Sequence, residues 1–497
     1  MKSILNLILK EKIYFLSLLG CIACTDPPSS MMNIEEFETP DHSQRHDDEV
    51  DLANDLALMD QGIDETDFEA VPDEALDWND VLQTKVGVLQ VRTNGIEIDE
   101  RVDDRSWVDV DLLTFESEEA LSQGVVLWQG QAAIHIRGNS SVGYEKKQYA
   151  LETRDPQSQD LDVSLFNLPE EEDWVLHAPF SDKTLMRNHL MYRWSRSIGR
   201  YAPRTHFVEV YIKPDEGEFT QEDYRGVYVL IEKIKRDQYR VNVEKFKNHP
   251  QFMTPQGGYL LKRDWVEGEV ITTDIYQDQL TLVYPKTNQA TSEQWVLIEN
   301  DLNQFERALE RNDGSYVEHI DIDSFVDHML MMELSRNVDS YVLSTFMHKK
   351  QDGLLTMGPI WDFNGSLGNA NYFRSWEPEG WHYQNPEFPA DNPNGFKWYE
   401  HLLEDPLFTQ RLSDRWTAHR LGPWATELLM NEIDQVVALL NRVQVRNFER
   451  WPILGEHIWP NDEEAETRDS YLDEIEYLKI WLTARLTWLD EQLLKEQ

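Results

Sequence analysis

The sequence predicts an α+β protein whose strands come first and whose helices follow. Between about 81 and 285, apolar residues alternate or form short runs, which is the pattern of half-buried and buried strands. From about 286 to 497 they recur every three or four positions, which indicates helices with one buried face. Strands followed by helices favour the α+β class, and we expect two lobes with a cleft between them.

The first part contains several expected strands and one helix. A turn is expected at Asn94-Gly95, after the first strand. Apolar residues spaced by four predict a helix over 182–199, with Ser181 or Asp182 as its cap and Gly199 after its end. The expected strands are 86–92, 132–137, 147–151, 207–212, 227–231 and 258–261.

The second part is expected to be helical except for one interval. Phe325 to Leu334 share an apolar face behind the capping candidates Asp321 and Asp323. The interval 354–363 reads as a strand, and the pattern over 472–493 predicts a long final helix.

The first twenty residues have the features of a secretory signal. Lysines precede a short apolar stretch over 13–19, and Gly20 stands before Cys21. The run Leu18-Leu19-Gly20-Cys21 resembles the bacterial lipobox, so we expect Cys21 to be lipidated; the alternative is an ordinary cleaved signal. The remaining cysteine is Cys24, which excludes a disulfide framework and a cysteine nucleophile from the rest of the chain.

An acidic segment follows the expected signal. Residues 31–80 hold 18 Asp and Glu against one basic residue, Arg45, so we expect 21–80 to be a disordered tether. The folded domain is then expected over 81–497. The whole chain carries a formal net charge of −46, which disfavours nucleic acid as a partner and favours cationic ones.

Two regions carry candidate chemistry. The first is a turn of small residues over 136–149, which contains Lys146 and Lys147. Backbone N–H groups of such a turn can approach phosphate oxygens, but composition alone favours an ordinary hairpin turn. The second pairs Asp339, after a helix, with Asp362, after a strand. Two such carboxylates can orient a hydroxyl and hold Mg²⁺, although capping and turn roles are commoner for aspartate.

Several ordered motifs resemble the CotH (spore coat protein H) kinase family. They include IRGNSSVGYEKKQY over 136–149, the stretch 174–199, RGVYVLIEKI over 225–234, RNVDS over 336–340 and GPIWDFNGSLGN over 358–369. The resemblance covers roughly 85 to 450. It implies an atypical protein-kinase fold that binds ATP with Mg²⁺ or Mn²⁺ and phosphorylates serine or threonine.

The resemblance also implies roles for individual residues. Asp339 is expected to be the catalytic aspartate, and Asp362 the metal aspartate. The residues expected to bind ATP are Arg137, Asn139, Ser140 and Ser141 in the phosphate loop, Lys147 in preference to Lys146, and Glu232 as a partner for a lysine.

Two positions depart from what the resemblance leads us to expect. Asn364 stands where the family usually has a second aspartate, and Ser344 stands where a conventional kinase has a metal-binding asparagine. Both offer oxygen, but with less charge or a weaker dipole, so metal affinity is expected to fall.

We therefore expect an exported kinase, tethered by lipid in a bacterial cell envelope and facing outside the cytoplasm. Its expected substrate is a protein, with a basic, serine-rich one as the candidate. The alternative is a catalytically weak or inactive surface scaffold or adhesin with the same fold. A carbohydrate-active protein ranks below both, because the 17 tryptophans fall mostly on apolar helical faces and are better interpreted as core.

Overall fold

The computed structural model describes most of the chain after the acidic segment. The signal expected over 1–20, the tether expected over 21–80 and the lipidation candidate Cys21 lie outside the described residues. The described ranges are 83–96, 98, 107–247, 255–266, 268–388 and 396–494. In this part of the chain, no helix has the length and apolarity needed to cross a bilayer.

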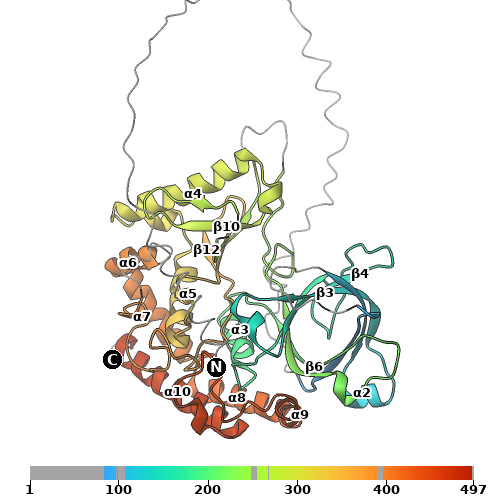
Figure 1. The fold of residues 1–497 in the computed structure, drawn as a ribbon. Helices are drawn as coiled ribbons and strands as arrows, with labels where there is room; N and C mark the ends of the chain where they lie inside the picture. Colours follow the sequence, from blue (N-terminus) through green and yellow to red (C-terminus); the bar gives the residue numbers. More distant parts are fainter. Residues whose placement is uncertain are drawn as a thin grey trace, which may run out of the picture. The chain divides into compact units, whose positions relative to one another are not determined.

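Seven strands close into a barrel in the order β1-β2-β3-β4-β5-β7-β6, and β1 closes it by pairing with β6 in parallel (Figure 1). The predicted strands at 86–92, 132–137, 147–151, 207–212 and 227–231 all lie in this barrel. The strands are β1 (Gly87–Arg92), β2 (Val108–Phe115), β3 (Trp128–Arg137), β4 (Gln148–Arg154), β5 (Asp173–His177), β6 (Thr205–Lys213) and β7 (Tyr224–Glu232).

Strand β7 shows why part of the barrel is apolar throughout. Tyr228 and Leu230 belong to the core inside the barrel, whereas Val227, Val229 and Ile231 pack in the larger core that contains the helices. Successive side chains of a strand point to opposite faces, so a strand covered on both faces is a continuous apolar run rather than an alternating one.

A second sheet has the order β12-β11-β8-β10-β9 and combines strands from both sequence parts. The strand predicted over 354–363 covers only two residues, because Pro359 has no N–H with which to continue a ladder. The strands are β8 (Tyr259–Arg263), β9 (Ile271–Thr272), β10 (Gln279–Tyr284), β11 (Thr345–Lys349) and β12 (Thr356–Met357).

Helices dominate the rest of the described chain, so the predicted α+β class is confirmed. Trp194, Trp398, Trp416, Trp424 and Trp481 are buried in their shared core, as expected for structural tryptophans. The helices are α2 (Glu118–Ser122), α3 (Arg187–Ser197), α4 (Ser292–Glu310), α5 (Ile322–Ser335), α6 (Phe396–Glu404), α7 (Pro406–Arg420), α8 (Thr426–Leu440), α9 (Val443–Arg450) and α10 (Tyr471–Leu493). Asp321 caps α5, as one of its two candidates predicted.

The start of α3 differs from the prediction. The helix begins at Arg187, not near 182, because Leu185 has a left-handed φ of 65° that interrupts the turn. Asp182 still serves the helix: its carboxylate accepts hydrogen bonds from the backbone N–H of Thr184 at 3.2 Å and of Arg187 at 2.9 Å. The polar turn before α3 therefore replaces the predicted first helical turn.

Candidate active site

The segment of Asp339 and the segment of Asp362 are joined by hydrogen bonds. The Asn337 side-chain N–H donates to the backbone oxygen of Asp362 at 2.9 Å, and the Val338 N–H donates to the Gly365 oxygen at 3.3 Å. The Asp339 N–H donates back to the Asn337 side chain at 3.4 Å. The two aspartates that the sequence singled out are thus brought together by Asn337, one of the three residues of RNVDS between α5 and Asp339.

Asp362 is held in an uncommon backbone conformation. Its φ is 63°, in the left-handed region, where non-glycine residues are rare and persist only when their surroundings fix them. Helix α3 supplies the fixing contacts. The hydroxyl oxygen of Tyr192 accepts from the Asp362 N–H at 3.1 Å, and the Asn188 side chain accepts from the Phe363 N–H at 2.6 Å. Arg187 donates to the Ser366 oxygen at 3.0 Å, so three side chains of α3 hold this loop.

The carboxyl groups of Asp339 and Asp362 both have raised pKa values at this site. Burial, together with the charges of Asp362 and Asp264, raises the pKa of Asp339 to about 8. Burial also raises the pKa of Asp362 to about 6, where Arg137 opposes the effect and Asp264 adds to it. Carboxyl groups that disfavour one another's ionisation form a site that a bound cation would stabilise.

Asp264 is the member of this group that the sequence analysis missed. It follows β8, which pairs with β11 through Arg263 and Thr345. Ser344 precedes β11, so continuing this register places Ser344 opposite Asp264. Asp264 bonds Lys262 at 2.9 Å. An aspartate three residues after the end of the run 257–261 was the available signal.

The phosphate-loop candidates lie in the turn between β3 and β4. Gly138 has a φ of 114°, and a Cβ there would lie 2.0 Å from the Ser141 hydroxyl, so the turn requires glycine. Asn139 and Ser140 are exposed. Arg137 lies with its guanidinium carbon 5.6 Å from the ring centre of Trp361, the residue before Asp362. The turn therefore starts beside the Asp362 loop.

The two lysines after the turn have different surroundings. Lys147 donates to the Val142 backbone oxygen at 2.9 Å and stays at the turn. Lys146 is buried and donates to the Val227 backbone oxygen at 2.6 Å and to the Asn447 side chain at 2.9 Å. Burial holds the pKa of Lys146 well below its ordinary value. Lys146 thus connects the barrel to α9, and Lys147 remains the lysine closer to the turn.

Glu232 and Asn364 complete the set of predicted residues. Glu232 is fully buried and pairs with Arg204 at 2.8 Å, not with either candidate lysine. Asn364 lies two residues after Asp362, and its backbone oxygen accepts from the Asn369 side chain at 2.8 Å. The structure therefore places Asn364 in the Asp362 loop and ties Glu232 to a different cation.

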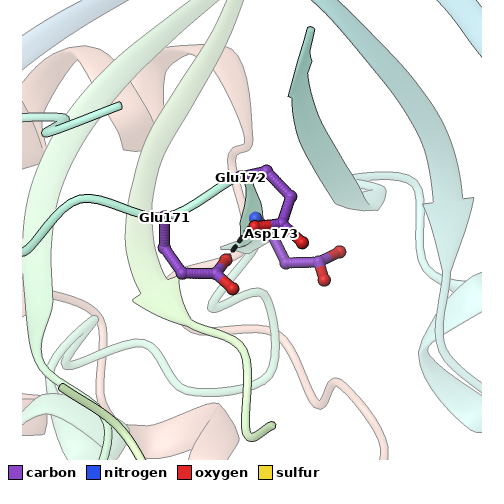
Figure 2. A group of neighbouring side chains, drawn as sticks. All are labelled: Glu171, Glu172 and Asp173. Carbon is purple, nitrogen blue, oxygen red and sulfur yellow. Dashed lines mark hydrogen bonds between the residues drawn. The ribbon is translucent and has the colours of Figure 1, made fainter. Parts of the chain in front are cut away.

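A second acidic group lies at the start of β5 (Figure 2). One ligand atom from each of Glu171, Glu172 and Asp173 lies within 4.8 Å of the others, a spacing that suits a metal ion. The ammonium group of Lys235, however, contacts all three carboxylates. Burial raises the pKa of Glu171 to about 7, opposed by Arg240 and Lys235. Lys235 thus provides the counter-charge in this cluster.

A comparison with models of known protein families identifies the family of this chain. A family model described as "CotH kinase protein" matches residues 134–489, most of the chain. The chain belongs to the CotH kinase family. The CotH match contains every predicted site residue from Arg137 to Asn364, and it confirms the resemblance seen in the motifs. A search of curated proteins found no significant match.

Proposed function

We propose that this CotH-family protein is an exported, lipid-anchored kinase that transfers the γ-phosphoryl group of ATP to serine or threonine of a protein. The observation that carries the proposal is the joining of Asp339 and Asp362, both with raised pKa values, beside the Arg137 turn. We also propose that the barrel and the helical part form the two lobes of a kinase-like fold, with the nucleotide bound in a cleft between them. The net charge of −46 favours a basic substrate segment.

The residues present fit a divalent metal. Asp362 would hold it, and Asp264 lies near enough for its charge to raise the pKa of Asp362. The oxygens of Asn364 and Ser344 are weaker candidate ligands. Mg²⁺ or Mn²⁺ supplies neutralisation of phosphate charge in this class of reaction. Arg137 and Lys147 would contact phosphate oxygens, aided by the N–H groups of the turn.

Asp339 is the proposed general base. The substrate hydroxyl oxygen forms a bond to the γ-phosphorus, the bond to the β-phosphate oxygen breaks, and the hydroxyl proton passes to Asp339 while ADP leaves. A neighbouring cation would lower the pKa of Asp339 and make its ionised form available near neutral pH. The half-buried position of Asp339 and its charged neighbours therefore suit a base.

Radiolabelled ATP with Mg²⁺ or Mn²⁺ tests this function on the full-length chain. We expect labelling of the chain itself or of a basic, serine-rich peptide. Asp339→Ala and Asp362→Ala should each abolish labelling, and Asp362→Ala should also weaken metal-dependent ATP binding. The exposed Asp160→Ala is the matched control and should label like the wild type. Equal labelling by wild type and both site variants would contradict the assignment.

The scaffold alternative has one specific observation in its favour, the replacement of expected ligands by Ser344 and Asn364. The double change Ser344→Asn and Asn364→Asp adds a carboxylate beside Asp362. In a weakened kinase site it should tighten Mg²⁺-dependent ATP binding and raise labelling above wild type. An absence of nucleotide binding in both forms would favour the scaffold.

A further inference from the structure

A continuous hydrogen-bond chain, buried except at its half-buried Gln148 end, runs from the barrel to the residue after Asp362. The Phe363 N–H donates to the Asn188 oxygen at 2.6 Å. The Asn188 nitrogen lies 3.1 Å from Nε2 of His177, and Nδ1 of His177 lies 2.9 Å from the Gln148 side-chain oxygen. Gln148 begins β4, directly after Lys147, and pairs with Arg137 of β3. The chain therefore connects the base of the phosphate-loop turn to the Asp362 loop.

The direction of each hydrogen bond follows from the charge state of His177. Burial lowers the pKa of His177 to about 3, so the ring is neutral and carries one proton. Asp182 opposes this effect, whereas Arg137 and Lys146 add to it. With the Gln148 oxygen as acceptor, the proton sits on Nδ1, and Nε2 accepts from the Asn188 amide. Each contact of the chain then has a defined donor and a defined acceptor.

This arrangement assigns a task to Asn188 and His177. Asp362 has a left-handed backbone that relaxes unless it is held, and ligand groups lose function when they move by a fraction of an ångström. We propose that Asn188 and His177 are positioning residues that fix Asp362 relative to the Arg137–Ser141 turn. The inference rests on the proposed kinase function, but the backbone contact that carries it is measurable without ATP.

Two substitutions of Asn188 test the proposal in the full-length protein. Asn188→Leu has a similar volume and removes both hydrogen bonds. Asn188→Asp keeps an acceptor for the Phe363 N–H but presents a second oxygen to Nε2 of His177. While the Gln148 oxygen keeps the ring proton on Nδ1, two acceptors face each other at Nε2 until the ring takes up a second proton, so this variant should hold the loop at low pH and release it at high pH.

Amide hydrogen exchange of a peptide covering 362–367 is the first readout, and the affinity for Mg²⁺·ATP is the second. Each is expressed relative to wild type at pH 5.5 and pH 8.5. Asn188→Leu should speed exchange and weaken affinity about tenfold or more at both values, as expected for a buried group that loses its partner. Asn188→Asp should approach wild type at pH 5.5 and resemble Asn188→Leu at pH 8.5.

The matched controls are Asn288→Leu and Asn288→Asp, at an exposed asparagine, and neither readout should change. Unchanged exchange in Asn188→Leu would overturn the proposal, as would faster exchange with wild-type affinity. If Asn188→Asp speeds exchange and weakens affinity equally at both pH values, His177 has no positioning role. If the wild type binds no Mg²⁺·ATP, the kinase function fails, and exchange alone decides whether Asn188 and His177 hold the loop.

Discussion

Removing the charge of Asp339 should stabilise the protein at alkaline pH while abolishing phosphoryl transfer. Asn has nearly the shape of Asp, so Asp339→Asn changes charge with little change in volume. The pKa of Asp339 is about 8 in the folded chain, and an aspartate in an unfolded chain has a pKa near 4. The folded state therefore binds this proton more tightly, and its contribution to stability is lost as the pH rises from about 4 to about 8.

The size of the effect follows from the same values. At about 1.4 kcal/mol for each tenfold difference in proton affinity, the upper bound is roughly 6 kcal/mol. Asp339 and Asp362 are only half-buried, and solvent screens their repulsion. We therefore expect a net stabilisation of about 1–3 kcal/mol above pH 8. For a domain of this size the melting temperature rises by about 1 °C per kcal/mol.

Calorimetry in the presence of a chelator, from pH 5 to pH 9, measures this difference. The stability advantage of Asp339→Asn over wild type should grow with pH, and the exposed control Asp160→Asn should show no such trend. A difference that is the same at pH 5 and pH 8.5 would refute the electrostatic reasoning. A variant that is less stable than wild type at pH 8.5 would refute it as well.

Three further predictions concern the anchor, the helical core and the helix–barrel contact. Cys21→Ala should release the protein from the membrane fraction or leave an uncleaved precursor. A variant that is still found as a mature, membrane-bound protein would refute lipidation of Cys21. Asp327 is buried and bonds His419 at 2.9 Å, so Asp327→Asn should cost about 3–5 kcal/mol in a denaturant titration, and a smaller loss would show that its charge matters little. Gly226→Ala would place a Cβ at 2.7 Å from the Asn447 side chain at a φ of 104°, so the melting temperature should fall by about 2 °C or more; an unchanged value would mean that α9 can shift.

The barrel strands were predictable because their apolar patterns are local. The run Val227–Ile231 predicted most of β7, and the spacing over 472–493 predicted α10 to within one residue at its start. The start of α3 was not predictable, because spacing cannot show that Leu185 adopts a left-handed conformation. The short β12 reflects Pro359, whose effect on the ladder depends on where the neighbouring strand lies.

The candidate site was predictable where motifs mark it and hidden where tertiary contacts create it. Asp339 and Asp362 stood out as carboxylates at the ends of regular elements. Asp264 did not, because its relation to them depends on the pairing of β8 with β11, more than eighty residues later in the chain. Asn188 lay within a recognised motif, but its bond to Phe363 could not be inferred from spacing. A single sequence shows which residue types could take part in chemistry, whereas the electrostatic interaction between distant carboxylates can be recognised only once the fold is known.

The contact between Lys146 and Asn447 spans 301 residues and has a consequence for biosynthesis. During translation the barrel strands are complete long before α9 emerges. Until it does, Nζ of Lys146 and the Val227 N–H lack the Asn447 oxygen that accepts from both in the finished protein. A chain that stops before α9 keeps buried polar groups without this hydrogen-bond acceptor, which destabilises its fold. Truncated products should therefore be less stable than the complete protein and more readily degraded by proteases.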